Sequence, residues 1–281
     1  MNSLRGHAVH HRDSAQWLDG NMMNEDRLKD QWRMNTTSYE FLGTQFMALT
    51  LEQTIDWLVS RKDGTEFQYI VTPNVDHIVR MWRDPKTYKH LYDGATLSVC
   101  DSRILEVMAR LSGIPLSPVP GSDVTAHLFK DYINAGEAVN IIGGDAQIYD
   151  SLKSRFGLSQ LNQHIPPMGL KNKPEAIKAC AEFIAANRAR FTFICVGSPQ
   201  QELVAQAAQN HPDCVGTGLC VGASLEFLTG RVKRAPLWVQ KLRMEWLYRL
   251  ASEPKRLWKR YLVEGPRVFY LWMRWSLGKR L

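Results

Sequence analysis

The sequence lacks the features that mark secreted and membrane-spanning proteins. Its first twenty residues, MNSLRGHAVHHRDSAQWLDG, hold no apolar run that could act as a signal peptide, and apolar stretches such as VFYLWM are too short to cross a bilayer. Only five cysteines occur, an odd number without a C-x-x-C pair, and most lie in apolar runs. We therefore expect reduced core thiols and a cytoplasmic location.

Motifs of several common chemistries are also missing. There is no G-x-G-x-x-G dinucleotide fingerprint, no Walker A sequence and no G-x-S-x-G elbow, which disfavours a Rossmann-type oxidoreductase, a P-loop enzyme and a serine hydrolase. No D-x-D occurs and the eight histidines are scattered. A carboxylate-bound divalent metal is therefore not indicated, and we expect neither a metal nor a cofactor.

Basic charge and tryptophan are present, and both are concentrated at the C-terminal end. The chain has a formal net charge of +7, but residues 233–281 hold thirteen Lys and Arg against three Glu, so this stretch carries +10 and the rest −3. Five of the nine tryptophans lie in the same stretch. Such a concentration favours a partner of negative charge.

One unit recurs along the chain: an apolar segment, a small or polar turn, and an amphipathic stretch. Continuous apolar strands that alternate with helices are typical of a parallel sheet covered on both faces. We expect an α/β, Rossmann-like, doubly wound fold with a mainly parallel sheet, preceded by a strand or hairpin and a helix that Thr50 opens. The expected parts are a mobile tail at 1–35, an α/β body at 36–230, and a basic, Trp-rich helical appendage at 231–281.

Glycine and polar residues follow each expected strand. Parallel strands end at one edge of the sheet, where helix N-termini offer free N–H groups to ligands. Glycine lets the backbone approach a phosphate, and Thr, Asn, Gln and Asp bind sugar hydroxyls, so together they indicate a phosphorylated, hydroxyl-rich ligand. Each turn alone also has an ordinary explanation. The sequence GGD at 143–145 suits any strand-to-helix turn, and Asp101 suits a helix cap.

The stretch 255–262 has the pattern of a two-faced helix. Its basic positions are Lys255, Arg256, Lys259 and Arg260, and its apolar or aromatic positions are Leu257, Trp258, Tyr261 and Leu262. A basic face beside a Trp-bearing face suits the surface of an anionic bilayer. The alternative is a helix packed on the body with a solvated charged face. Nucleic-acid binding is disfavoured because no known module accompanies the charge.

Five motifs in fixed order resemble the WecG/TagA/CpsF family of bacterial glycosyltransferases: TPNVDHIV, CDSRILEVMARLSGIPLSPVPGSDV, IIGGDAQ, VGSPQQE, and a last block containing GRVKRAPLW, EWLYRL and EPKR. The resemblance covers about residues 40–265. It implies a metal-independent, inverting transferase that moves a sugar from a UDP-sugar to a polyprenyl-diphosphate-linked saccharide at the inner face of the cytoplasmic membrane.

The resemblance also implies roles for single residues. Asp101 falls on the proposed general base, while Thr72 and Asn74 match the T-x-N that contacts the sugar. This sequence departs from the family pattern twice, because Ser102 stands where Gly usually follows the Asp and Pro118 replaces an arginine that looks like a diphosphate contact.

The residue assignments fall into three further groups. The substrate group is Thr72, Asn74, Ser122, Asp123, Gln201 and Glu202. The nucleotide and diphosphate group is Gly143, Gly144, Asp145, Gly197, Gly222, Ser224 and Arg234. The membrane group is Arg256, Trp258, Lys259 and Arg260.

The expected activity is the transfer of a hexose-type sugar, such as N-acetylmannosamine, its uronic acid or glucose, in cell-surface polysaccharide synthesis. The expected partners are the UDP-sugar, the lipid-linked acceptor and an anionic inner-membrane surface, without nucleic acid. A homo-oligomer is a further possibility that the sequence does not decide. The alternative function is a non-catalytic membrane-surface scaffold with a degenerate UDP-sugar site, which would need only the basic tail and a stable body.

Overall fold

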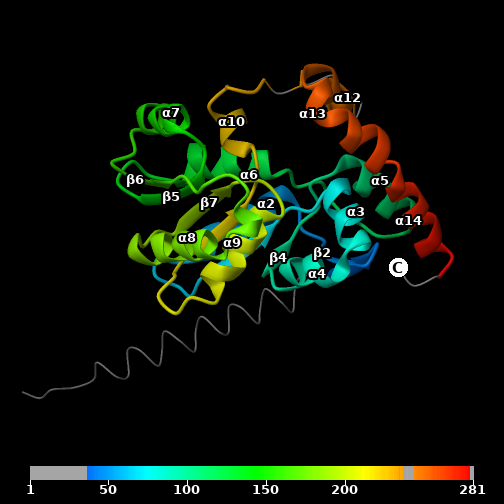
Figure 1. The fold of residues 1–281 in the computed structure, drawn as a ribbon, viewed down its shortest axis with the longest axis horizontal. Coiled ribbons are helices and arrows are strands. Elements are labelled where there is room, and N and C mark those ends of the chain that lie inside the picture. Colours follow the sequence, from blue (N-terminus) through cyan, green and yellow to red (C-terminus); the bar gives the residue numbers. More distant parts are fainter. Residues whose placement is uncertain (1–36, 234, 237–238, 240–243, 279–281) are drawn as a thin grey trace, which may run out of the picture. The chain divides into compact units, whose positions relative to one another are not determined.

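A wholly parallel sheet of six strands lies at the centre of residues 38–281, which form one unit (Figure 1). The computed structural model describes residues 37–233, 235–236, 239 and 244–278, apart from the side chain of Arg256. The expected N-terminal tail and Arg234 lie outside these residues. The strand order is β4-β3-β8-β7-β5-β6. The strands are β3 (Gln68–Val71), β4 (Leu97–Ser98), β5 (Ala138–Gly143), β6 (Gln160–His164), β7 (Phe191–Cys195) and β8 (Thr217–Cys220).

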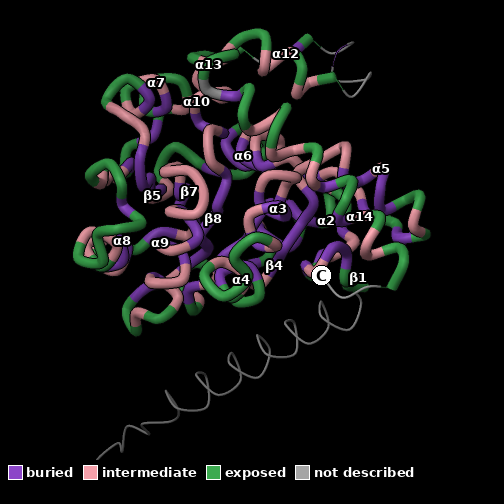
Figure 2. The backbone as a smooth tube through the Cα atoms, turned by 45° about the vertical axis from the view of Figure 1, so that its right-hand side comes forward, coloured by how far each residue is buried: buried purple, intermediate pink, exposed green. Residues whose placement is uncertain are grey.

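The central strands are buried on both faces, as their continuous apolar sequences predict (Figure 2). A two-stranded hairpin of β1 (Ser38–Phe41) and β2 (Thr44–Met47) precedes them. Thr50 opens the following helix α2 (Leu51–Ser60) through a capping box with Gln53, as expected. The five cysteines are free thiols, and all except Cys195 are buried.

Helices connect the strands on both sides of the sheet. Right-handed crossovers place helices on opposite faces when the chain reverses its direction across the sheet. The chain moves outward from β5 to β6 and then back through β7 to β8, so α7 lies on one face and α8 with α9 on the other. The doubly wound prediction is confirmed. These helices are α3 (Val75–Arg83), α4 (Pro85–Asp93), α5 (Arg103–Leu111), α6 (Gly121–His127), α7 (Ala146–Phe156), α8 (Pro174–Ala186), α9 (Gln200–Gln209) and α10 (Ser224–Leu228).

The C-terminal segment, here residues 244–278, is helical, as predicted, and its last helix belongs to the hydrophobic core. Val268 and Leu271 are fully buried, and the Trp275 ring meets the Phe41 ring edge-on with centroids 5.2 Å apart. The segment is therefore packed on the body along its last turns (Figure 1). Its elements are α12 (Glu245–Ser252), α13 (Pro254–Trp258), the π-helix η3 (Lys259–Glu264) and α14 (Arg267–Ser276).

Candidate active site

The turns after β3, β4, β5, β7 and β8 lie at one edge of the sheet, because all the strands run parallel. Asp101 follows β4 and its backbone N–H donates to Pro73 O at 3.0 Å, so it sits beside the turn that carries Thr72 and Asn74. The sheet thus brings together the predicted base and the predicted sugar contacts.

Asp101 is partly exposed and lies in an unusual electrostatic setting. Burial, and then the negative charge of Glu245, raise the pKa of the Asp101 carboxyl to about 8, while Arg249 opposes the rise. Asp123 and Arg260 add smaller effects of opposite sign. Charged side chains of the C-terminal segment therefore surround this acid, and the pKa lies where a general base for a hydroxyl is effective near neutral pH.

Asp101 does not cap the helix that follows it. Ser102 is the N-cap of α5, and its hydroxyl accepts a hydrogen bond from Leu105 N at 3.2 Å. The Ser102 hydroxyl already satisfies an open N–H of the first turn, so the helix does not need the neighbouring acid. This observation removes the helix-cap explanation of Asp101.

The two polar side chains of the T-x-N turn after β3 lie in different settings. The Thr72 side chain is buried, and the Asn74 side chain caps the helix α3. Thr72 is buried and donates to Cys220 O at 3.4 Å. Asn74 caps α3 and accepts from Asp76 N at 3.1 Å and from Arg260 Nη2 at 3.4 Å. The first turn of α6, which carries Ser122 and Asp123, lies close by, because a Cβ on Gly121 would be 3.3 Å from Thr72 Oγ1.

Glycines shape the turns after β5, β7 and β8. Gly143 has φ +100°, and a Cβ there would lie 2.9 Å from Cys195 O, so the turns after β5 and β7 touch through this glycine. Gly144 also has positive φ, as do Gly197, which faces open space, and Gly222. The connections that leave these two neighbouring strands run to opposite sides of the sheet, because β5 leads outward to β6 and β7 leads back to β8. Ligands bind at such a point in open α/β sheets.

Asp145 caps α7 by accepting from Ile148 N at 3.1 Å, and its carboxylate also pairs with Arg231. The hydrogen bond from Arg231 lowers the pKa of Asp145 below its usual value. Arg231 is thus a cation beside the nucleotide-side turn that sequence analysis did not single out, although it lies within the quoted GRVKR motif.

Gln201 and Glu202 are buried, and their contacts are internal. Gln201 accepts from Gly222 N at 2.9 Å and donates to Glu202 Oε1 at 2.9 Å. Both the oxygen and the nitrogen of the Gln201 amide are therefore bonded to protein groups, and the bond from Gly222 N ties the turn after β8 to α9. Ser224 is also buried, at the first turn of the short helix α10.

Nearly the whole chain matches a known family. The model of the Glycosyl transferase WecG/TagA/CpsF family covers residues 39–281. The chain belongs to this family. It is therefore a glycosyltransferase, and the family implies a sugar donor and a lipid-linked acceptor in general terms.

In this member of the WecG/TagA/CpsF family, two arginines of the C-terminal segment act on Asp101. Arg249 and Arg260 both lower the pKa of the Asp101 carboxyl, against the larger effect of burial. Sequence analysis placed Arg260 on the membrane, but its side chain turns inward to Asn74 and Asp76 because the helical segment continues past α3. Trp258 and Lys259 are exposed, and the Arg256 side chain lies outside the described residues.

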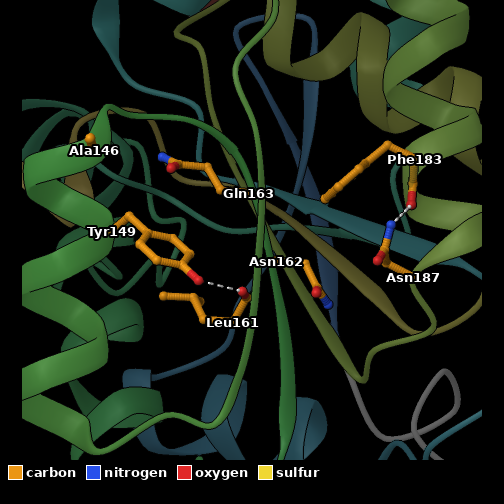
Figure 3. Close-up of a pocket in the computed structure, with 7 residues that line it drawn as sticks. All are labelled: Ala146, Tyr149, Leu161, Asn162, Gln163, Phe183 and Asn187. Atoms are coloured by element: carbon orange, nitrogen blue, oxygen red, sulfur yellow. Dashed lines mark hydrogen bonds between the residues drawn. The ribbon is translucent and has the colours of Figure 1, made fainter.

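A separate open pocket lies at the free edge of the sheet (Figure 3). Its lining comes from α7, β6 and α8. Gln163 links it to the glycine turn by donating to Gly143 O at 2.9 Å and to Asp145 O at 3.2 Å. The pocket residues are Ala146, Tyr149, Leu161, Asn162, Gln163, Phe183 and Asn187.

The described part of this glycosyltransferase shows neither a metal-ligand cluster nor a membrane-spanning helix. No group of three or more His, Cys, Asp or Glu side chains is arranged to hold a metal ion. Among the helices that the structure describes, none combines the length and apolarity needed for a membrane span.

Proposed function

We propose that the protein is an inverting, metal-independent transferase that moves a hexose-type sugar from a UDP-sugar to a polyprenyl-diphosphate-linked saccharide. The observation that carries the proposal is Asp101, a residue of intermediate exposure at the strand-end edge whose carboxyl has its pKa raised to about 8, mainly by burial. N-acetylmannosamine, its uronic acid and glucose are the candidate sugars.

In the proposed reaction Asp101 takes the proton of the acceptor hydroxyl. The hydroxyl oxygen forms a bond to the anomeric carbon, and the bond from that carbon to the UDP oxygen breaks with its electron pair staying on UDP. Attack from the face opposite the leaving group inverts the anomeric centre. Thr72 and Asn74 lie beside Asp101 and would orient the sugar.

The leaving UDP needs its negative charge offset. Glycine turns at Gly143 and Gly197 can bring the backbone close to the diphosphate, and Arg249 and Arg260 supply positive charge near Asp101. These two arginines would replace the family arginine absent at Pro118. Arg231 pairs with Asp145 of the GGD turn and would supply further positive charge for the leaving UDP. The described residues offer cations and turns for this task without a metal-ligand cluster.

The C-terminal segment also carries the features expected of a surface that lies on an anionic membrane. Half-exposed apolar side chains occur along α13, η3 and α14 and just after α14, and the exposed Lys259 lies among them in sequence. We assign the protein to the inner face of the bacterial cytoplasmic membrane as a peripheral enzyme. The side chains in question, called the outer stripe below, are Trp258, Leu262, Phe269, Met273 and Leu277.

The deciding experiment compares Asp101→Asn with Ser102→Ala. Asparagine has nearly the same shape as aspartate, so Asp101→Asn should fold normally and bind UDP-sugar. Because asparagine cannot take the proton, the variant should transfer the sugar about a hundredfold more slowly or worse. Ser102→Ala should lose about 1 kcal/mol of stability and keep its transfer rate once folded. Transfer is read by mass after candidate UDP-sugars are mixed with lipid-linked acceptors, and it should continue in excess EDTA.

The competing function is a non-catalytic scaffold with a degenerate site. UDP release that requires donor and acceptor together would exclude it. Equal transfer by wild type and Asp101→Asn would exclude the assignment of Asp101 instead.

A further inference from the structure

A chain of polar contacts links the C-terminal segment with the turn after β7. It starts at Arg260 of η3, whose Nε lies 3.8 Å from Asp76 Oδ2. The same Asp76 oxygen accepts a hydrogen bond of 2.7 Å from Arg80 Nη2. Arg80 uses its other terminal nitrogen, Nη1, to donate to Ser198 Oγ at 2.7 Å. Two guanidinium groups therefore share one carboxylate oxygen, and one of them spans from α3 to the Gly197–Ser198 turn.

The chain continues inward from Ser198. Tyr92 Oη donates to Glu202 Oε1 at 3.3 Å and lies 3.1 Å from Ser198 Oγ. Tyr92 has one hydroxyl hydrogen and gives it to Glu202, so Ser198 donates to Tyr92 and accepts from Arg80. Gln201 also donates to Glu202 Oε1, which brings the turn after β8 into the same network.

The inner end of this network is the buried carboxyl of Glu202, whose burial costs free energy of folding. Glu202 is almost fully buried, and its Oε2 has no hydrogen-bond partner among the described residues. Burial raises the pKa of this carboxyl. Burial also lowers the pKa of His77, whose ring centroid lies 5.9 Å from that of Tyr92, so both side chains favour their neutral forms. A buried polar network of this kind fixes geometry more than it stabilises the fold. The geometry that it fixes is that of the turns after β7 and β8.

We propose that Arg80 is a positioning residue that couples docking of the C-terminal segment to donor binding at the turn after β7. This inference rests on the proposed function for the nature of the donor. Arg80 can do this because its planar fork holds two partners in different directions, Asp76 and Ser198. Arg260 competes for Asp76 and so acts on Ser198 through Arg80. Coupling of this kind is reciprocal, so bound donor also favours the docked segment.

The first test is the variant Arg80→Lys, with Arg83→Lys as a matched control. Lysine keeps the charge but, as a point charge, cannot hold both partners in the fork geometry of Arg80. Arg83 lies three residues further along α3 and binds Glu264 of the same C-terminal segment at 2.8 Å, without a contact to Asp76 or Ser198. Arg80→Lys should raise the KM for the UDP-sugar about tenfold with a smaller change in kcat. Arg83→Lys should match wild type, and equal behaviour of the two variants would overturn the proposal.

The second test is a double-mutant cycle on donor affinity with Arg80→Lys and Arg260→Met. If Arg260 acts through Arg80, the two effects should be less than additive. Fully additive effects would mean that Arg260 acts on the donor only through its own charge near Asp101, with no part passing through Arg80, and would overturn the coupling.

A third measurement needs no ligand. Hydrogen exchange of the amides at 196–202 should speed up in Arg260→Met and stay unchanged in Arg83→Lys. If wild type binds no UDP-sugar, the proposed function fails while this measurement still decides the coupling. If Arg80→Lys does not fold, Ser198→Ala breaks the same link at its other end and should reproduce the donor effect. Unchanged exchange in Arg260→Met contradicts the proposal.

Discussion

Asp101 and Ser102 have different roles at the start of α5. Ser102 caps the helix, and Asp101 is the proposed general base. The Ser102 hydroxyl accepts the capping hydrogen bond from Leu105 N of α5. The charges that act on the Asp101 carboxyl are those of Glu245 and Arg249 of α12, Asp123 of α6 and Arg260 of η3. Two of these neighbours are acids and two are bases. The balance leaves burial as the largest influence on the pKa of Asp101.

The raised pKa of about 8 predicts how transfer depends on pH. A general base works when deprotonated, so kcat/KM should rise about tenfold per pH unit well below 8 and level off above it. The measurement is a profile from about pH 6 to 9.5 with a UDP-sugar and a lipid-linked acceptor. A flat profile over this range would contradict the role of Asp101, as would an unchanged profile in Asp101→Asn.

The same shift predicts a pH effect on folding. The folded pKa of about 8 exceeds the ordinary value of 3.8, so the folded protein holds the proton over the interval between them. The stability that Asp101 contributes is full below about pH 4 and is lost as the pH rises through about 8. Asp101→Asn removes this loss, and its free energy of unfolding relative to wild type should grow from pH 5 to pH 9. Urea unfolding measures this difference, and a difference independent of pH would refute the prediction.

The sequence could predict the strand-to-helix units but not the contacts made by the C-terminal segment. Apolar runs and turn residues are local signals, so the strand ends, the Thr50 cap and the parallel sheet were all predictable. Arg260 meets Asn74 from 186 positions away in the chain, and a two-faced helical pattern does not say which face meets the body. For the same reason the sequence placed Arg231 and Arg249 in the GRVKRAPLW and EWLYRL motifs without showing that they act on Asp145 and Asp101.

The loop after β5 offers a test of how closely it packs on the loop after β7. Gly143 and Gly113 both have positive φ, but only at Gly143 would a Cβ lie 2.9 Å from a backbone oxygen. Gly113→Ala should cost about 1 kcal/mol from backbone strain alone. Gly143→Ala should cost about 1–3 kcal/mol more and should weaken UDP binding, because the two turns must separate. Thermal unfolding and UDP titration check both variants, and equal costs would contradict the close packing.

At the scale of the whole molecule, helix α14 is part of the hydrophobic core. The boundary expected at residue 231 separates a basic appendage from the body, yet Val268 and Leu271 are fully buried and Trp272 Nε1 donates to Ser112 Oγ at 2.8 Å. Deletion of residues 265–281 should therefore destabilise the protein by roughly 3–6 kcal/mol from the two aliphatic side chains alone. Urea unfolding of the truncated chain measures this loss. Wild-type stability after deletion would show that the segment is an independent appendage.

Because truncation would disturb the core, membrane binding is better tested by substitutions on the outer stripe. Trp258, Leu262, Phe269 and Met273 are each about half exposed, and none belongs to the buried core. Replacing all four by Ser should weaken binding to anionic vesicles by roughly a hundredfold or more, since each apolar side chain that enters the interface contributes on the order of 1 kcal/mol.

The matched control for this substitution is Met168→Ser, which removes an apolar side chain that is 91% exposed on the loop after β6. It should leave vesicle binding unchanged while the four-site variant loses it. The four-site variant should melt earlier than wild type, because the buried half of each side chain is lost, so vesicle binding is compared at a temperature where both variants are folded. Added salt should also weaken wild-type binding, since the cations of this region act through a screened surface potential. Equal vesicle binding by wild type and the four-site variant would mean that the outer stripe does not face the bilayer, and would leave the inward-facing Arg260 as the functional part of this segment.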